Sequence, residues 1–189
     1  RRGLARGYVA EGRLGRGAVP GMSLLDNALL TGYEKDLSKH GLIDAAALDG
    51  FAQRCIVGFN VKCRGPQAVA DSLSGGNLQK FIVGREILQA PRLLVVAQPA
   101  WGVDVQACAF IRRTLIDLRN AGVAVLVVSD DLDELFEICD SLLVIAEGRL
   151  SPPKRREDTN VEEVGLWMSG LWPAAYNLSN EETRHAAQA

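Results

Sequence analysis

The sequence predicts an α/β fold built on a parallel sheet, and three features predict it. Residues 93–97 and 123–128 are uninterrupted apolar runs of strand length. Each run is followed by a segment with helical periodicity, so strands and helices alternate along the chain. Strands without a polar face are typical of parallel sheets that helices cover on both sides.

Helical patterns surround these strands in the second half of the chain. A helix expected over residues 74–88 ends before Pro91, which cannot continue it. The next helix begins at Asp104 and ends at Gly122. Its apolar stripe consists of Cys108, Ile111, Leu115 and Leu118. Ser129 is expected to cap a further helix with an acidic first turn, which suits the helix dipole.

Shorter elements are expected after residue 140. Glu147–Gly148 predicts a hairpin turn, because apolar residues flank it on both sides. A short amphipathic helix is expected over residues 161–168. The tail after Pro173 is expected to be poorly ordered.

The first half of the chain reads differently. Residues 7–10 are expected to be the end of a strand, and the glycine- and arginine-rich loop Glu11–Gly17 follows them. Residues 22–57 are mainly helical in pattern, with breaks near Thr31–Gly32 and residues 39–41. A Ser at position 23 can cap the first of these helices.

The composition is that of an ordinary globular protein. Of the 189 residues, 48% are hydrophobic and 23% are charged, with a formal net charge of −2. This charge gives no general attraction to nucleic acid or to an anionic membrane. The longest apolar run, Ala121–Val128, is far shorter than the roughly 20 residues that cross a bilayer. No signal peptide is recognisable, and because the chain opens on Arg1 we expect an upstream portion.

Four cysteines are spread through the sequence without a C-x-x-C pair: Cys55, Cys63, Cys108 and Cys139. This spacing predicts neither a zinc site nor a disulfide framework. Two of them, Cys108 and Cys139, lie among apolar residues of predicted helices, so we expect buried free thiols and a reducing compartment.

The most informative string is Leu73–Lys80, LSGGNLQK. A Ser followed by two glycines at the start of a helix can receive an anion, because the first N–H groups are free and the dipole favours negative charge. The same residues can also form a glycine-rich helix cap that holds no ligand. The string alone leaves both interpretations open.

Its context resembles one family. Leu73–Lys80 resembles the signature motif of ATP-binding cassette (ABC) ATPases, in the Asn-x-Gln-Lys form of sugar and nucleoside importers. The loop at Tyr8–Gly17 resembles the segment these importers carry at the Q-loop position, with Glu11 where Gln is usual. Further matches follow in the family's order, at residues 94–99, 102–104, 129–134 and 140–149. The resemblance covers roughly residues 5–150. Within the family, this segment is most similar to the second cassette of nucleoside-type importers.

The resemblance implies a partial cassette: a RecA-like parallel sheet with flanking helices and a helical subdomain, without the Walker A half. No G-x-x-x-x-G-K-[ST] loop is present, and Gly12, Gly15 and Gly17 do not form one because no Lys follows them. We expect that loop upstream of Arg1. The implied parts are a strand with the Q-loop-like segment (1–19), a helical subdomain (20–72), a signature helix with the RecA-like core (73–150), and a C-terminal helix and tail (151–189).

The resemblance also implies a degenerate Walker B site. The family places an Asp and a Glu where this chain has Ala97 and Gln98, and its switch His corresponds to Asp130. An alanine cannot support magnesium, and a neutral amide is a poor base. Asp130 can instead be an acid in the first turn of a helix. Trp101 replaces a residue that is usually basic in the family, which leaves the contacts with a partner open there.

The expected activity therefore lies in trans. In the family two cassettes pair head to tail, and each ATP lies between one phosphate loop and the other cassette's signature helix. We expect ATP with Mg²⁺ to be held mainly by the partner and this chain alone to be inactive. The residues implied to contact nucleotide are Ser74, Gly75, Gly76, Asn77, Gln79, Asp104 and Glu11. Asp104 can at the same time be a helix N-cap.

The resemblance implies a subunit that powers import of simple sugars or nucleosides. Its expected partners are a second cassette, a transmembrane permease and, indirectly, a solute-binding protein, at the cytoplasmic face of the bacterial inner membrane. The helical subdomain would transmit motion to the permease, and Glu11–Gly17 would be the hinge. The alternative is a non-transport ABC ATPase acting on DNA or ribosomes, or a catalytically dead interaction module. The near-neutral charge argues against nucleic acid.

Overall fold

A computed structural model describes residues 5–32, 37–39 and 42–173. The chain divides into two compact units, Arg1–Asp131 and Leu132–Ala189. No helix within the described ranges is both long and apolar enough to cross a membrane.

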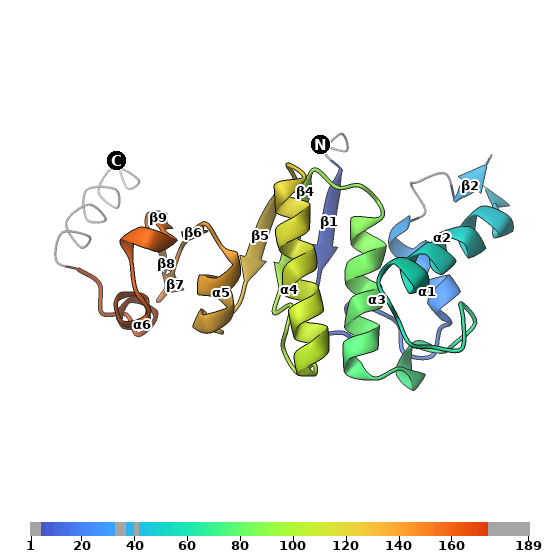
Figure 1. Ribbon diagram of the computed structural model, residues 1–189, viewed down its shortest axis with the longest axis horizontal. Coiled ribbons are helices and arrows are strands. Elements are labelled where there is room, and N and C mark those ends of the chain that lie inside the picture. Colours follow the sequence, from blue (N-terminus) through green and yellow to red (C-terminus); the bar gives the residue numbers. More distant parts are fainter. Residues whose placement is uncertain (1–4, 33–36, 40–41, 174–189) are drawn as a thin grey trace. The chain divides into compact units, whose positions relative to one another are not determined.

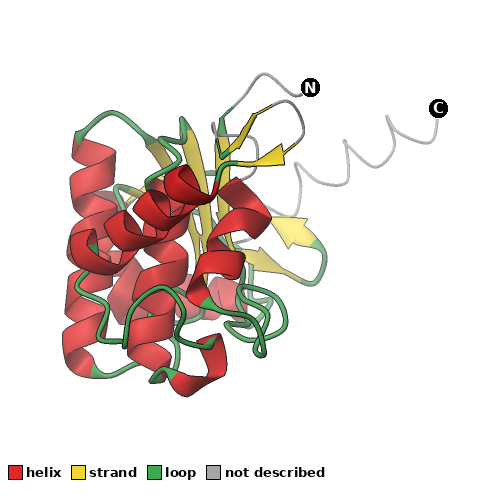
Figure 2. Ribbon diagram, turned by 90° about the vertical axis from the view of Figure 1, so that its right-hand side faces the viewer, coloured by secondary structure: helices red, strands yellow, loops and turns green. Residues whose placement is uncertain are grey.

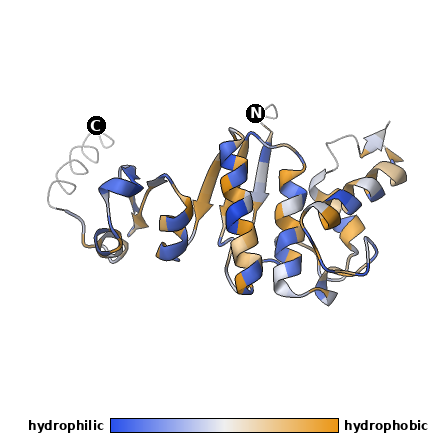
Figure 3. Cartoon of the chain, viewed as in Figure 1, coloured by the Kyte–Doolittle hydropathy of each residue, from blue (hydrophilic) through white to orange (hydrophobic). Residues whose placement is uncertain are grey.

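The first unit contains a three-stranded parallel sheet. Its strands are β1 (Arg6–Val9), β4 (Leu93–Ala97) and β5 (Ala124–Val128), in the order β1-β4-β5. The predicted strands over residues 93–97 and 123–128 are thus confirmed to within one residue. Figure 3 shows β5 as hydrophobic along its length, and β4 is the central strand of the sheet.

Two long helices, α3 (Gly75–Ile87) and α4 (Val105–Asn120), cover one face of this sheet (Figures 1 and 2). The covered face is apolar: Leu94 and Val96 of β4 are fully buried, as is Ile111 of α4. The alternation of strand and helix therefore produces the predicted α/β layer.

Within the first unit, the opposite face of the sheet is exposed. Tyr8, Leu126 and Val128 are all exposed by about half or more of their surface. Tyr8 and Leu126 lie in one row across the sheet, because each is in register with Val95. Among the described residues of the first unit, the helices therefore cover one face of the sheet and leave the other exposed.

The helical part comprises α1 (Leu24–Gly32) and α2 (Ala45–Gly58), with a small antiparallel pair between them, β2 (Ser38–Lys39) and β3 (Leu42–Ile43). Ser23 caps α1 as predicted, since its Oγ accepts from the backbone N–H of Asp26 at 3.0 Å. A short 3₁₀ turn, η1 (Ala70–Ser72), leads into α3. Two of the predicted break points, residues 40 and 41, lie outside the described residues.

The second unit is built from short elements. They are α5 (Leu132–Ile138), β6 (Ser141–Leu142) paired with β9 (Lys154–Arg155), β7 (Ile145–Ala146) paired with β8 (Arg149–Leu150), η2 (Arg156–Asp158) and α6 (Val161–Met168). The predicted hairpin is confirmed, because Glu147 and Gly148 both have positive φ, at 51° and 72°. Residues 174–189 of the tail lie outside the described residues.

None of the four cysteines forms a disulfide bond. Cys55 is buried, and its burial raises the pKa of the thiol to about 12. Cys108 and Cys139 are only half-buried, so the expectation that they are buried is wrong in degree. Cys108 lies at the margin of the packed side of α4, whereas Cys139 directly follows the end of α5 at Ile138 and so is not in a helix as expected.

Candidate functional site

The start of α3 carries the signature-like string. Ser74 is the N-cap, in an extended conformation, and α3 begins at Gly75. The Ser74 hydroxyl accepts from Nδ2 of Asn77 at 2.8 Å and from its backbone N–H at 3.4 Å. Ser74 therefore caps α3. This cap does not exclude an anion at the same end, because Ser74 is exposed and the first N–H groups of a helix have no partner within the helix.

The next two polar side chains of the motif are held by the protein itself. Oδ1 of Asn77 accepts from the backbone N–H of Lys62 at 2.8 Å. Gln79 is buried, and its Nε2 donates to the carbonyl of Pro99 at 3.2 Å. Gln79 thus ties α3 to the segment that follows β4, while its Oε1 has no hydrogen-bond partner among the described residues.

Asp104 meets the start of α3 from the other side. One carboxylate oxygen accepts from the N–H of Ala107 at 2.9 Å, so Asp104 caps α4 as predicted. The other oxygen lies against Gly76, where an added Cβ would come within 2.6 Å of it. An added Cβ at Gly75 would lie 3.4 Å from the carbonyl oxygen of Gly102. The structure therefore places the predicted residues Gly75, Gly76 and Asp104 side by side.

A cation that the sequence analysis missed lies at the same place. The Arg13 guanidinium donates to the carbonyl of Trp101 at 2.6 Å. Its atoms lie 3.3 Å from the Cβ position of Gly75 and 3.2 Å from that of Gly102. Arg13 lies in a glycine-rich loop, and the sequence of this loop does not indicate which residues Arg13 contacts in the fold.

The three positions implied to be degenerate lie at the carboxyl ends of two adjacent strands. Ala97 is in register with Val128. Gln98 donates its backbone N–H to the carbonyl of Val128 at 2.7 Å, and Asp130 follows two residues later. Parallel strands bring these ends to one edge of the sheet, as the resemblance implies.

This edge has a strained residue but few chemical groups. Gln98 has a φ of 50°, in the left-handed region that costs a non-glycine residue energy. Its Oε1 accepts from the Ser129 hydroxyl at 3.4 Å. Neither the methyl group of Ala97 nor the amide of Gln98 is a metal ligand of the kind magnesium prefers. Nowhere in the described ranges do three or more His, Cys, Asp or Glu side chains form a group that could hold a metal.

The expected placement of Asp130 and Ser129 at the start of the next helix is wrong, and the role of Glu11 stays a prediction. Helix α5 begins at Leu132, so Asp130 precedes its first turn and the acids of that turn are Asp133 and Glu134. The Ser129 hydroxyl accepts from the N–H of Asp131 at 3.1 Å, in a turn before the helix rather than at its cap. Glu11 follows the carboxyl end of β1, is exposed, and makes no hydrogen bond or ion pair with a described residue.

A buried ion pair joins α3 to the first half of the chain. Nε of Arg85 lies 3.0 Å from Oε1 of Glu86. The same guanidinium donates to the carbonyls of Asn27 in α1 at 3.0 Å and of Gly17 in the loop at 2.9 Å. Oε1 of Glu86 also accepts from the Thr31 hydroxyl at 2.8 Å. Sequence reasoning missed this cluster, because an Arg-Glu pair on a helix usually faces solvent.

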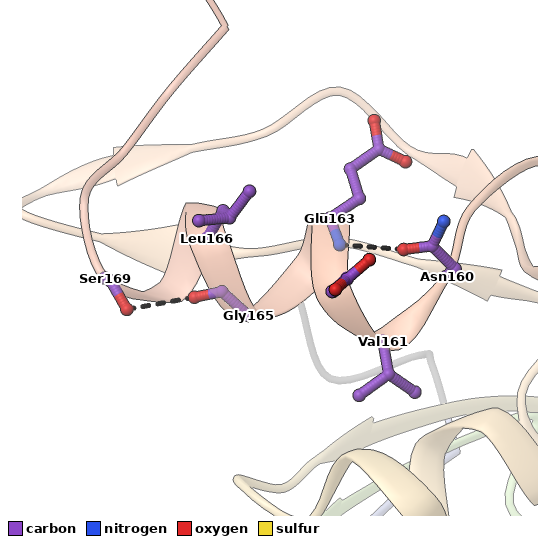
Figure 4. Close-up of a pocket in the computed structure, with 7 residues that line it drawn as sticks. Asn160, Val161, Glu163, Gly165, Leu166 and Ser169 are labelled. Carbon is purple, nitrogen blue, oxygen red and sulfur yellow. Dashed lines mark hydrogen bonds between the residues drawn. The ribbon is translucent and has the colours of Figure 1, made fainter.

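A hollow in the second unit carries no comparable arrangement. It lies along α6 and is lined in part by Asn160, Glu163, Gly165 and Ser169 (Figure 4). Asn160 accepts from the N–H of Glu163 at 2.8 Å, and Ser169 donates to the carbonyl of Gly165 at 3.0 Å. These polar groups stabilise the two ends of the helix.

Curated proteins similar to this chain include ATP-binding proteins of sugar and nucleoside import. The chain is 40% identical over 165 residues to the nucleoside import ATP-binding protein NupA of Lactococcus lactis subsp. cremoris (strain MG1363), which covers 87% of this chain and 33% of that protein. It is 37% identical over 165 residues to the guanosine import ATP-binding protein NupO of Bacillus subtilis (strain 168), covering 87% and 32%. It is 34% identical over 158 residues to the ribose import ATP-binding protein RbsA of Streptococcus agalactiae serotype III (strain NEM316), covering 84% and 32%. The chain thus spans about a third of the length of these relatives. No family model matches the chain.

Solved structures that share this fold include ABC proteins. The dimeric post-hydrolysis state of the ATP-binding cassette MJ0796 bound to ADP and Pi superposes with a TM-score of 0.67 at 19% identity, over 81% of this chain and 63% of that one. An inward-facing putative metal-chelate type ABC transporter gives a TM-score of 0.71 at 16% identity, over 88% and 64%. At these identities the likeness concerns the fold alone.

Proposed function

Because the chain belongs to the family of ATP-binding proteins of ABC-type sugar and nucleoside importers, we propose that it supplies the signature motif in trans to ATP held by a partner cassette. The chain spans about a third of its relatives, so the activity is that of a longer protein in which this segment takes part.

One observation carries the proposal: the start of α3 is exposed at Ser74 and is lined by glycines. Gly75 is half-buried and Gly76 is buried against Asp104, so Ser74 is the exposed part of this end, and the positive end of the helix dipole favours a phosphate there. The Ser74 hydroxyl, already held by Asn77, can donate its proton to a phosphate oxygen. Ser74, Gly75 and Gly76 would therefore close on the γ-phosphate, with Asp104 beside them at the seam between the two cassettes.

The other site residues have supporting roles in this proposal. Asn77 fixes the orientation of Ser74, and Gln79 holds α3 against the carbonyl that follows β4. Glu11, exposed beyond the end of β1, would stand at the Q-loop position near this chain's own strand ends. These residues act on nucleotide geometry, while the phosphate loop and the magnesium ligands belong to the partner cassette.

This chain's own strand ends would not support hydrolysis. A water attacking the γ-phosphate needs a group that orients it and a metal that neutralises charge. At the positions concerned, Ala97 offers a methyl group, Gln98 a neutral amide and Asp130 an exposed carboxylate. We infer that the composite site on this side binds nucleotide weakly or without turnover.

The proposed setting is an importer at the cytoplasmic face of the bacterial inner membrane. ATP would close the pair of cassettes, and the helical part around α1 and α2 would pass the motion to a transmembrane permease. A solute-binding protein would deliver the solute to that permease. The segment Glu11–Gly17 would be the hinge. The importer relatives support this setting, and the proposal includes no nucleic-acid partner.

The test is ATP turnover of the complete transporter with Ser74→Arg. The larger cation fills the space in front of the helix, so turnover should be abolished. The matched control is Ser72→Arg, because Ser72 is also exposed but belongs to η1. Loss of turnover in Ser74→Arg alone supports the trans role, and unchanged ATPase and transport rates in that variant contradict it.

A second candidate function is a catalytically dead cassette that acts as an interaction module. The altered strand ends favour it, because they remove the chemistry and leave the fold intact. Purification of the full-length protein separates the two: a transport subunit is recovered with its permease, whereas a non-transport cassette is recovered without it.

A further inference from the structure

We propose that Arg13 is a positioning residue, which fixes the start of the signature helix against the turn after β4. The inference rests on the proposed function, because the start of α3 is where the partner's ATP would be met. Arg13 does not belong to the signature-like string Leu73–Lys80 and lies much earlier in the chain.

Arg13 contacts both sides of the junction between α3 and that turn. Its Nη1 donates to the carbonyl of Trp101 at 2.6 Å. The guanidinium passes directly over two glycines, 3.3 Å from the Cβ position of Gly75 and 3.2 Å from that of Gly102. Gly102 has a φ of 63°, in the left-handed region that favours glycine. The absence of side chains at these two glycines makes room for the arginine.

The loop that carries Arg13 is itself held against α3. It folds back on itself through hydrogen bonds from the N–H of Gly17 to the carbonyl of Gly12, and from the N–H of Ala18 to the carbonyl of Arg13, both at 2.7 Å. Gly17 is buried against Ile82, where an added Cβ would come within 2.9 Å of Cδ1. The carbonyl of Gly17 accepts from the buried Arg85. The loop is thus fixed near the middle of α3 and reaches back to its first residue.

This arrangement connects two parts of the proposed cycle. The loop leaves β1 at Glu11, beside the strand ends of this chain's own site, and ends on α3, which would face the partner's site. A displacement of the loop would therefore move Arg13 away from Trp101 and release the turn beside Gly75. Because the loop is anchored to α3 at Gly17, its movement is confined to the loop residues that precede Gly17.

The positive end of the α3 dipole does not favour a guanidinium by itself, so the charge of Arg13 is suited to an incoming anion rather than to the helix. The guanidinium lies at the N-terminal end of α3, where an incoming phosphate would be stabilised by positive charge. The charge-assisted hydrogen bond to Trp101 is also stronger than a neutral one. A glutamine at position 13 would lose both the charge and the reach, while a lysine would keep the charge and one donor.

The experiment measures ATP turnover of the complete transporter with Arg13→Gln, Arg13→Lys and the control Arg16→Gln. Arg16 lies in the same loop but is exposed. Arg13→Gln should lower kcat by about tenfold, the worth of one charge-assisted hydrogen bond. KM for ATP should stay within about twofold, because the partner's phosphate loop sets it. Arg13→Lys should restore most of the rate, and Arg16→Gln should match the unaltered protein.

Hydrogen exchange of the same full-length proteins supplies a readout independent of activity. The N–H groups of Trp101 and Val103 bond within the turn, to the carbonyls of Gln98 and Ala100. Peptides covering residues 99–105 should exchange several-fold faster in Arg13→Gln and at the normal rate in Arg16→Gln.

The outcomes separate the two proposals. Unchanged turnover in Arg13→Gln, with turnover still abolished in Ser74→Arg, overturns the role of Arg13 and leaves the proposed function standing. Slower turnover without faster exchange over residues 99–105 overturns the positioning role. Unchanged turnover in Ser74→Arg overturns the proposed function, and exchange alone then decides whether Arg13 holds the turn.

Discussion

Gly76 and Asp104 are in direct contact across the junction of α3 and α4. An added Cβ at Gly76 would lie 2.6 Å from Oδ2 of Asp104 and 2.9 Å from Cβ of Ala107. The close packing of the signature turn on the α4 cap therefore requires glycine at this position, whatever ligand the turn receives.

Gly76→Ala should accordingly destabilise the fold. The methyl group would push α3 and α4 apart or break the cap at Asp104, at a cost of about 1–3 kcal/mol in the free energy of unfolding. Denaturant unfolding of the full-length protein measures it. The control is Gly58→Ala at the end of α2, where an added Cβ meets nothing within 4 Å. Equal stability of the two variants would show that the junction is looser than described.

Arg85→Met should be among the most destabilising substitutions in the chain. It would leave the buried carboxylate of Glu86 without its cation and remove the donors to the carbonyls of Asn27 and Gly17. Breaking a buried pair by removing one partner costs about 3–5 kcal/mol. Thermal or denaturant unfolding checks this, with Arg113→Met on exposed α4 surface as the control. A loss below about 1 kcal/mol would mean that the pair contributes little.

The strand ends can be tested by restoring the family's residues in the full-length protein. The double variant Ala97→Asp with Gln98→Glu should raise ATP turnover only when Asp130→His is added, and the gain is expected at the composite site that uses this chain's own strand ends. The reason is that metal support, a base and a switch residue act together. The measurement is ATPase activity of the double and triple variants. A gain from the double variant alone would show that Asp130 does not stand at the switch position.

The thiol of Cys55 should be unreactive in the folded protein under mildly alkaline conditions. Burial raises its pKa from 9.0 to about 12, so the folded state keeps the thiol protonated where the unfolded chain does not. The contribution of this protonated thiol to the free energy of unfolding is fully present below pH 9 and is lost as the pH rises from 9 toward 12. Alkylation at pH 9 should label half-buried Cys63 well before Cys55. Equal labelling rates would contradict the burial.

Local signals accounted for the elements that sequence reasoning found. Uninterrupted apolar runs predicted β4 and β5, and the side chains of Ser74 and Asp104 predicted where α3 and α4 begin. The short strands β6 and β9 went unpredicted, because two-residue strands have no periodicity to detect. The start of α5 was misplaced because Ser129, a good cap by type, bonds within a turn instead.

For the candidate site, the sequence predicted the residues of one continuous string together with Asp104 and Glu11. The residues that were missed act over long sequence separations. Arg13 contacts Trp101, and Arg85 contacts Gly17 and Asn27, at separations of 88, 68 and 58 positions. Only the tertiary fold brings such groups together, so no local pattern could indicate them.

The central claim is that the start of α3 meets a phosphate anchored by a different cassette. Hydrogen exchange over residues 74–79, with and without ATP and the partner cassette, tests it most directly. We expect protection of these amides only when ATP and the partner are both present, and no protection from ATP alone. Protection by ATP alone, or none with both present, would contradict the claim.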